Sequence, residues 1–190
     1  MPHLRHLQKN REIDRMRSTD TDEQIKVASL DDVAILSGLI RISYRDVAQR
    51  FDLTPENCPK HPSNCADEWI RNDFDRGVAY YILEHNSLPA GCAALEIPDP
   101  DIGYLERLAV LPANRRKGFG RRLVDHVFHQ ATDSGIKKIS IGIIAAQTDL
   151  TRWYRKIGFI EGDTKEFKHL PFLVTFMMYH LPSKGGINES

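Results

Sequence analysis

The chain has 190 residues, of which 41% are hydrophobic and 27% charged, a length and composition typical of one soluble globular domain with a single core. Lys plus Arg and Asp plus Glu number 26 each, so no overall positive charge recruits nucleic acid. No apolar stretch approaches the about 20 residues that a membrane-spanning helix needs. We therefore expect neither a nucleic-acid partner nor a membrane partner.

The three cysteines, Cys58, Cys65 and Cys92, are odd in number and follow no signal peptide. A disulfide framework is therefore not expected, and we place the protein in a reducing cytoplasm. Two of the cysteines flank His61, a grouping that raises the question of a zinc site. A structural zinc site needs four ligands, and the local sequence offers no fourth. We expect ordinary thiols in a loop and no metal.

Residues 1–23 are polar, carry both charges and show little apolar periodicity, which predicts a flexible N-terminal arm. The folded domain is expected over residues 24–181. Residues 182–190 are rich in Gly and Ser and predict a flexible tail.

The first half of the domain predicts a short strand over residues 24–28 and then two helices. Apolar residues repeat every three to four positions from Val33 to Phe51, which indicates a helix of about 20 residues. A loop with three prolines follows. Asn64 is the expected N-cap of the second helix, and Gly77 supplies its left-handed C-terminal position.

Three consecutive strands are predicted next, over Val78–Glu84, Ala90–Ile97 and Ile102–Val110. The segments between them have turn compositions, and both connections are short. Short connections of this kind join antiparallel neighbours, so we expect a meander.

A glycine-rich segment follows the third of these strands. Pro112 ends the strand because proline has no N–H for a ladder. Residues 115–117, Arg-Arg-Lys, then precede Gly118 and Gly120. An amphipathic helix begins there, and its apolar face is formed by Phe119, Leu123, Val124, Val127, Phe128 and Ala131. Glycine leaves the backbone N–H groups accessible, and a helix N-terminus attracts anions, so this segment predicts a phosphate site.

The remaining segments complete a mixed sheet. Lys137–Ala145 reads as a strand that returns by a crossover and therefore lies parallel to Ile102–Val110. Thr148 is the expected cap of a last helix that ends at Gly158. Two further strands are expected near 159–167 and 174–181. The predicted fold class is thus α/β.

The glycine segment matches neither the dinucleotide fingerprint nor the P-loop. Its Arg-x-x-Gly-x-Gly pattern, Arg115 to Gly120, resembles the acetyl-CoA loop of GNAT N-acetyltransferases. Three further features stand at the spacing of that family: the Leu108–Val110 strand end, the helix after the loop, and Trp-Tyr-Arg-Lys-Ile-Gly-Phe at Trp153–Phe159. The resemblance covers roughly residues 24–181. It implies a mixed, mostly antiparallel central sheet with helices on both faces, in which two central parallel strands splay apart.

The resemblance also implies an enzyme. It would move an acetyl group from acetyl-CoA, as cosubstrate, to a primary amine by direct attack in a ternary complex. Backbone N–H groups of the loop, helped by Arg115, would bind the pyrophosphate, and backbone groups of the third strand would bind the pantetheine arm. Gln147 stands where many relatives carry an asparagine. The expected cofactor-binding residues are Leu108, Val110, Arg115, Arg116, Lys117, Gly118, Gly120, Arg121 and Gln147.

Two residues are candidates for acid–base catalysis. Glu106, expected on the same strand face as Leu108 and Val110, is the candidate base that takes a proton from the amine. An ion pair with Arg107 is the alternative. Tyr154 matches the position of the family's general acid, which protonates the leaving thiolate, and packing in the core is its alternative role.

Tyr44, Trp69 and His169 are the candidate acceptor-site residues. Core packing is the alternative for the two aromatic residues, and a solvated loop position is the alternative for the histidine. The acceptor itself stays open among an aminoglycoside, a polyamine, an amino acid and a protein N-terminus, and the resemblance allows a homodimer. A CoA sensor without turnover is the rival function. A nucleic-acid-binding protein that uses the basic residues 115–122 fits the neutral composition poorly.

Overall fold

The computed structural model describes residues 23–182. Residues 1–22 of the predicted arm and residues 183–190 of the predicted tail lie outside the described residues, whereas Glu23, also assigned to the arm, is the first residue of a strand. The strands are β1 (Glu23–Val27), β2 (Ala79–His85), β3 (Leu88–Glu96), β4 (Ile102–Val110), β5 (Lys138–Ile144), β6 (Ile160–Lys165) and β7 (Val174–His180). The α-helices are α2 (Val33–Ser43), α3 (Arg45–Arg50), α4 (Asp67–Asp75), α5 (Phe119–Asp133) and α6 (Thr148–Ile157).

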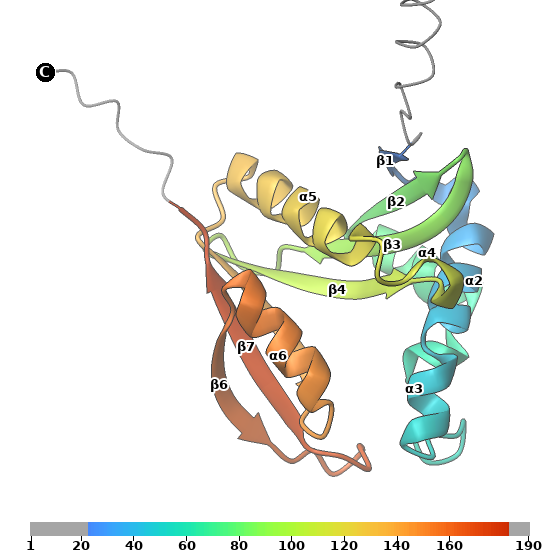
Figure 1. The fold of residues 1–190 in the computed structure, drawn as a ribbon, viewed down its shortest axis with the longest axis vertical. Coiled ribbons are helices and arrows are strands. Elements are labelled where there is room, and N and C mark those ends of the chain that lie inside the picture. Colours follow the sequence, from blue (N-terminus) through green and yellow to red (C-terminus); the bar gives the residue numbers. More distant parts are fainter. Residues whose placement is uncertain (1–22, 183–190) are drawn as a thin grey trace, which may run out of the picture.

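The seven strands form one sheet in the order β1-β2-β3-β4-β5-β7-β6. Only the β4–β5 pair is parallel. Helices α5 and α6 pack on one face of the sheet, and α2 and α4 pack on the other (Figure 1). This arrangement confirms the predicted mixed, mostly antiparallel sheet with helices on both faces.

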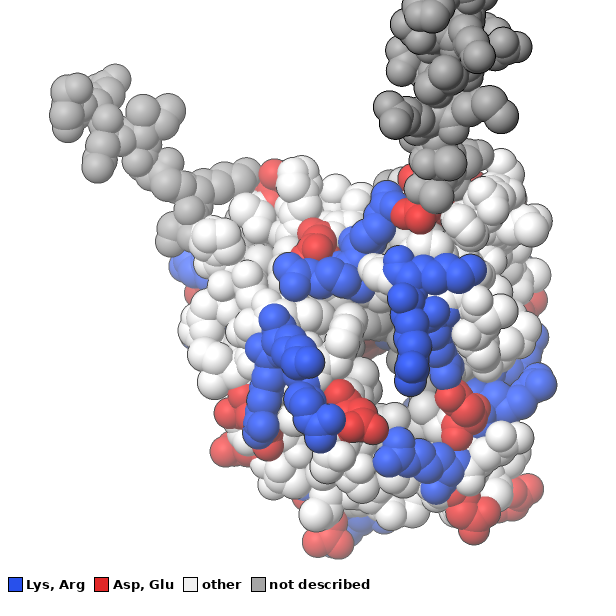
Figure 2. Space-filling view, in the orientation of Figure 1, with Lys and Arg blue, Asp and Glu red and all other residues white. Residues whose placement is uncertain are grey.

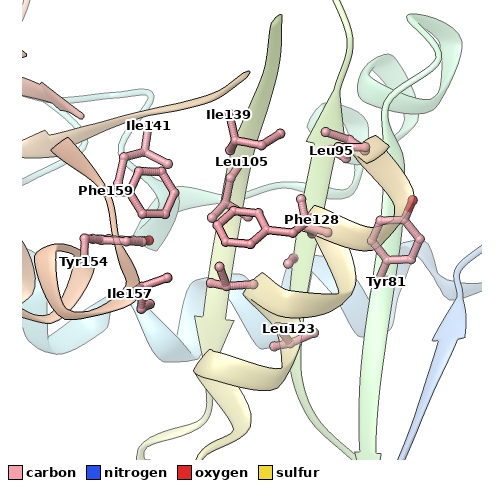
Figure 3. Packing of buried hydrophobic residues seen from close by; sticks show 14 of the residues in the cluster. Tyr81, Leu95, Leu105, Leu123, Phe128, Ile139, Ile141, Tyr154, Ile157 and Phe159 are labelled. Carbon is pink, nitrogen blue, oxygen red and sulfur yellow. The ribbon is translucent and has the colours of Figure 1, made fainter. Parts of the chain in front are cut away.

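The larger core lies between the sheet and the α5/α6 layer (Figure 3). Helix α5 buries all six apolar residues of the predicted stripe. Burying a large apolar side chain contributes about 1.5–3 kcal/mol, so this one face contributes on the order of 10 kcal/mol of hydrophobic stabilisation. The stripe therefore fixes the direction in which α5 leaves the glycine segment.

Strands β4 and β5 pair only at one end. Ile102–Tyr104 pairs with Lys138–Ser140, and the rest of β5 pairs only with β7. Beyond Tyr104 the two strands diverge, as the family resemblance implies. The β5-facing edge of β4 is thereby left open for a ligand.

A β-bulge interrupts β4 at Arg107. Its φ is +51°, and the register against β3 shifts there. Because a bulge adds one residue, side chains after it point to the opposite face from the one that simple alternation predicts. Leu105, Leu108 and Val110 all belong to the α5/α6 side. The prediction that Glu106 shares a face with Leu108 and Val110 is therefore wrong, and Glu106 points toward the α2/α4 layer.

The predicted helix over Val33–Phe51 is broken. Tyr44, with φ −100° and ψ 0°, separates α2 from α3. The Tyr44 hydroxyl donates to the carbonyl oxygen of Leu108 at 3.0 Å. This tertiary hydrogen bond positions Tyr44 across the gap between the helix layer and β4.

The start of the second helix also differs from the prediction. Asn64 ends a short 3₁₀ turn, and Ala66 is the N-cap of α4. The Asn64 side chain instead donates to the carbonyl of Cys58 at 3.2 Å. Asn64 thus closes the proline-rich loop rather than opening a helix.

Candidate active site

A cavity of about 890 Å³ opens where β4 and β5 diverge. Strands β4 and β5 line it on two sides, and residues of α3, α6 and the loop before β7 complete it. Lys and Arg side chains gather around a hollow in the face seen in Figure 2. The sheet therefore presents an open strand edge inside a basic rim.

The glycine segment is shaped to receive an anion. Gly118, the N-cap of α5, has φ +86°, and Arg116 has φ +64°. No side chain caps the helix, and no atom lies within 4 Å of the position where a Cβ would stand on Gly118. The first N–H groups of α5 are thus open to a phosphate, so the residues present fit the pyrophosphate of CoA.

Two of the basic residues assigned to the cofactor already have partners. Lys117 Nζ donates to Asn114 Oδ1 at 3.2 Å, and Arg121 Nε donates to both carboxylate oxygens of Asp125 at 2.8 and 2.9 Å. Both basic side chains are exposed at the start of α5. Their positive charge remains beside the phosphate site, although their hydrogen bonds point along the protein surface.

Arg115 does not point toward the glycine segment. Its Nη1 and Nη2 donate to Asp46 at 2.5 and 3.1 Å, and Nη2 also donates to the Ser43 carbonyl at 2.7 Å. Its Nε donates to the Val110 carbonyl at 3.2 Å. Arg115 therefore ties β4 to the α2–α3 junction, a role that its place in the sequence motif does not reveal.

At the two backbone positions assigned to pantetheine, the carbonyl groups already accept hydrogen bonds from side chains of the protein. The Leu108 carbonyl accepts from Tyr44, and the Val110 carbonyl accepts from Arg115. Burial raises the pKa of Tyr44 to about 12, so its hydroxyl stays a donor. Both carbonyl groups keep a second lone pair. Leu108 and Val110 line the cavity, as their assignment requires.

Tyr154 lies on α6 with its ring in the core and lines the cavity. The ring packs edge-on against Trp153 and Phe159 at centroid distances of 4.8 and 5.1 Å. Figure 3 shows its hydroxyl directed toward the strand that carries Leu105. Burial raises the pKa of Tyr154 above the ordinary phenol value, so the group is protonated and able to donate.

Glu106 is half-buried and lines the same cavity. Burial raises the pKa of its carboxyl group, and the neighbouring Arg107 guanidinium opposes that shift. A carboxylate with a raised pKa is a stronger base than an ordinary surface carboxylate. Its side chain lies toward the α2/α4 layer, on the opposite face of β4 from Leu108 and Val110.

The other predicted site residues divide between two cavities and the surface. Gln147 lines the main cavity and is the N-cap of α6, in place of the predicted Thr148. Trp69 lies in a separate, smaller cavity. His169 is exposed and does not line the main cavity, whereas Phe172 of the same loop does.

His61 is a cavity residue that sequence reasoning treated only as a zinc ligand. Burial, and then the charge of Arg107, lower its pKa, and its Nδ1 accepts from the Ser63 N–H at 3.3 Å. The ring lies edge-on to Tyr44 at 5.9 Å. Within residues 23–182 no cluster of three or more His, Cys, Asp or Glu is arranged to hold a metal. No sequence periodicity marks His61, because a loop fold carries it to the cavity.

These features together, an open strand edge between diverging parallel strands beside an uncapped helix N-terminus, are the arrangement that the acyltransferase resemblance implied. Residues 44–159 match the model of the acetyltransferase (GNAT) family. The chain therefore belongs to that acetyltransferase family, as its sequence predicted.

Curated relatives share part of the chain. An amino-acid acetyltransferase of Neisseria meningitidis serogroup A is 35% identical over 93 residues, which are 48% of this chain and 20% of the relative. One from Yersinia pseudotuberculosis is 26% identical over 145 residues, 76% of this chain and 28% of the relative. The chain thus matches between a fifth and just over a quarter of the length of these relatives.

Solved structures share the fold. The ribosomal-protein-S18-alanine N-acetyltransferase of Escherichia coli superimposes with a TM-score of 0.69 at 16% identity, covering 88% of this chain and 99% of that one. The PaiA N-acetyltransferase of Thermoplasma acidophilum, solved with coenzyme A, gives 0.69 at 18% identity, with 83% and 99% covered. No helix within residues 23–182 has the length and apolar character to cross a membrane.

Proposed function

We propose that the protein transfers the acetyl group of acetyl-CoA to the amine of a small acceptor by direct attack in a ternary complex. The observation that carries the proposal is the cavity between β4 and β5, which Glu106 lines from β4 and Tyr154 from α6. When bound, acetyl-CoA supplies a thioester carbonyl for the amine to attack and a thiolate that leaves. The protein has to hold that thioester, take a proton from the amine and return one to the sulfur.

Binding falls to backbone groups. The N–H groups at Gly118 to Gly120 would hold the pyrophosphate under the positive end of α5. The open edge of β4 at Leu108 and Val110 would pair with the pantetheine amides as an added strand does. The side chains of Tyr44 and Arg115 keep that edge in place through the two carbonyl groups.

Glu106 would be the base. An amine with a pKa near 10.4 is protonated at neutral pH, and removing that proton costs roughly 4–5 kcal/mol. Because burial raises the pKa of the Glu106 carboxyl group, the difference in pKa between this base and the amine is smaller than it would be for an exposed carboxylate. Proton transfer to Glu106, directly or through a water molecule, therefore costs less.

Tyr154 would be the acid. Its buried hydroxyl is protonated across the physiological range, and it points from α6 toward β4 (Figure 3). It can thus donate to a thiolate that leaves near Leu108. His61, whose Nδ1 is already an acceptor, has its Nε2 left for hydrogen bonding in the cavity.

The names of the relatives favour an acceptor with an α-amine. The curated relatives are amino-acid acetyltransferases, and one structural neighbour acetylates the alanine of a ribosomal protein. The main cavity is of a size that suits a small molecule together with the pantetheine arm. Three free, buried cysteines are consistent with the reducing cytoplasm expected from the sequence. The homodimer that the family allows is a further prediction, which sedimentation velocity would test.

The test is release of free thiol when the purified protein is mixed with acetyl-CoA and a panel of amino acids, their amides, polyamines and peptides. Thiol release that depends on the amine supports the proposal. Gly120→Ala should retain activity, because its Cβ would stand 3.5 Å from the Trp153 ring, an ordinary contact. Gly120→Glu should abolish CoA binding by placing a carboxylate in the anion site. CoA binding without thiol release from any amine would favour the sensor.

A further inference from the structure

A second cavity, of about 310 Å³, adjoins the main one. Its charged lining residues are Lys60, Glu68, Asp73, Arg76 and Arg107. Among the described residues, Arg107 is the one that lines both cavities. A group that enters beside Glu106 therefore meets the Arg107 guanidinium at the boundary between the two.

The bulge explains how Arg107 reaches this place. In a regular strand Glu106 and Arg107 would point to opposite faces, but the bulge turns successive side chains toward the same face. Arg107 lies 5.9 Å from the Trp69 ring of α4, and its charge affects the pKa of Glu106. The candidate base and a guanidinium are thus neighbours in the chain and in space.

The acidic neighbour of Arg107 has other partners. Asp73 accepts a hydrogen bond from the Tyr80 hydroxyl at 2.5 Å and one from Arg76 Nη2 at 2.8 Å. Arg76 also contacts Glu96 at 3.5 Å. Arg107 Nε forms only a long ion pair with the Asp73 carboxylate, at 4.0 Å, which is beyond hydrogen-bond distance. Asp73 is therefore satisfied without Arg107.

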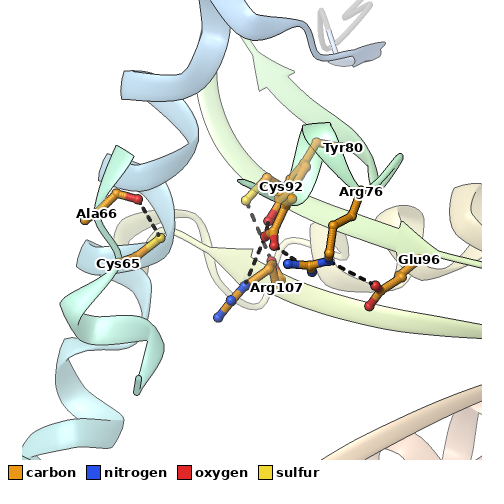
Figure 4. A network of polar contacts seen from close by, with 8 residues as sticks. Cys65, Ala66, Arg76, Tyr80, Cys92, Glu96 and Arg107 are labelled. Atoms are coloured by element: carbon orange, nitrogen blue, oxygen red, sulfur yellow. Dashed lines mark hydrogen bonds and ion pairs between the residues drawn. The ribbon is translucent and has the colours of Figure 1, made fainter. Parts of the chain in front are cut away.

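Arg107 keeps hydrogen-bonding capacity that its ion pair with Asp73 does not use. Its side chain is 20% exposed, and its Nε is buried without a hydrogen-bond partner among the described residues. Figure 4 shows its terminal nitrogens directed away from Arg76 and Glu96. Leaving a buried charged donor without a hydrogen bond is costly. A guanidinium held in this way is a natural partner for a carboxylate.

We propose that Arg107 binds the carboxylate of the acceptor, so that the substrate class is a free amino acid rather than a simple amine or a peptide N-terminus. This inference rests on the proposed acetyl transfer. In an α-amino acid one carbon atom separates the amine nitrogen from the carboxylate, so the two groups need neighbouring partners. Glu106 and Arg107 provide these partners. The smaller cavity next to Arg107 then receives the part of the amino acid that points away from the thioester.

The test compares each amino acid with its α-carboxamide, which keeps the amine and removes the negative charge. The measured quantity is the ratio of kcat/KM for the acid to that for the amide. The two amines differ in pKa, but that difference cancels when the ratio is compared between variants. Wild type should prefer the acid, and Arg107→Gln should lower the ratio by roughly tenfold to hundredfold, the loss expected for one charge-assisted hydrogen bond.

Arg76→Gln is the matched control. It removes a guanidinium from the same cavity, but this guanidinium already donates a hydrogen bond to Asp73. Its ratio should stay near that of wild type, and Arg107→Lys should retain part of the preference. Turnover of the amide by Arg107→Gln shows that the variant is folded. A wild type that uses acid and amide equally, or a ratio that Arg107→Gln leaves unchanged, would overturn the inference.

Calorimetry separates this inference from the proposed transfer. Binding of each acid and amide is measured on the protein with CoA present, where no transfer takes place. Tighter binding of the acid that is lost in Arg107→Gln supports the carboxylate site, even if no thiol is released in the enzyme assay. Equal binding of both ligands contradicts it.

Discussion

At the scale of single residues, Tyr154 and Glu106 reach the same cavity from different elements of the fold. Tyr154 comes from α6, and Glu106 comes from β4 just before its bulge. Both are shielded from water, and burial raises the pKa of each. For the phenol the shift preserves a proton donor, and for the carboxyl group it makes a stronger base.

Replacing Tyr154 with phenylalanine should lower kcat. The ring contacts with Trp153 and Phe159 would remain, and only the hydroxyl would be lost. General acid catalysis contributes roughly 10²–10⁴-fold, and the low end is expected because a CoA thiol is already fairly acidic. Stopped-flow measurement of the chemical step, together with CoA affinity, checks this. A variant with unchanged kcat would leave Tyr154 as a packing residue.

The rate should depend on the protonation of Glu106. A base must be deprotonated, so kcat/KM should fall as the pH drops through the raised pKa of this carboxyl group. Glu106→Gln should lose at least about a hundredfold in kcat/KM and flatten that limb of the profile. A pH profile with the same acidic limb in both proteins would assign it to another group.

The same pKa shift makes a prediction for stability. Because the folded state raises the pKa of Glu106, it binds the proton more tightly than the unfolded chain does. Its stabilising contribution is present at acidic pH and is lost as the pH rises through the folded pKa. Glu106→Gln should therefore gain stability over wild type at mildly alkaline pH and little at acidic pH, as urea unfolding at both values would measure.

At the scale of elements, the junction between α2 and α3 is joined to β4. The break at Tyr44 leaves the Ser43 carbonyl free of a helical partner, and Arg115 binds it. Arg115 also binds Asp46, and both side chains are partly exposed, so their pairing contributes no more than about 1 kcal/mol to stability. Its consequence is positional, because the same guanidinium holds the strand edge that faces the cofactor.

Arg115→Gln and Asp46→Asn should raise the KM for the acceptor to a similar extent, a few-fold, because each frees α3 from β4. The double variant should show little further change, since both substitutions break one interaction. CoA affinity, measured by calorimetry, should fall a few-fold at most in either single variant, because Tyr44 still holds the strand edge at Leu108. If Arg115 bound the pyrophosphate instead, Arg115→Gln would weaken CoA binding strongly and Asp46→Asn would not.

At the scale of the whole molecule, β1 closes one edge of the sheet. Ile25 packs against the large core, and the Glu23 carboxylate forms an ion pair with Arg122 and lies 4.0 Å from His85 Nδ1. The backbone N–H of Ala28 donates to the Tyr80 carbonyl at 2.9 Å. Glu23, which the sequence analysis assigned to the arm, is therefore part of the sheet.

A chain that starts at Glu23 should keep its Tm within about 2–4 °C of the full chain, the shift that roughly 1 kcal/mol makes in a domain of this size. A chain that starts after Val27 should lose clearly more, because β2 becomes an exposed edge and Ile25 leaves the core. Calorimetric scans of the three proteins check this. A large loss on removing residues 1–22 alone would show that they pack on the domain.

The sequence by itself determined the elements whose signals are local. Strand β4 ends at Val110, ahead of the proline that cannot continue a ladder, and α5 begins at Phe119, directly after a glycine in a left-handed conformation. The apolar stripe of α5 and the spacing of the motifs were sufficient to predict the family to which the chain belongs. These features depend on residues within one or two turns of each other, which is the range over which periodicity and backbone preference act.

Only the tertiary structure decided which side chains meet. The bulge at Arg107 depends on pairing with β3, and it placed Leu108 and Val110 on the opposite face of the sheet from Glu106. Arg115 pairs with Asp46, which lies 69 residues away in the sequence, and Tyr44 donates to Leu108 of β4, which lies 64 residues away. Partners so far apart in the chain are brought together by packing of the core, for which no local pattern exists. The same packing left Arg107 between two cavities beside the candidate base.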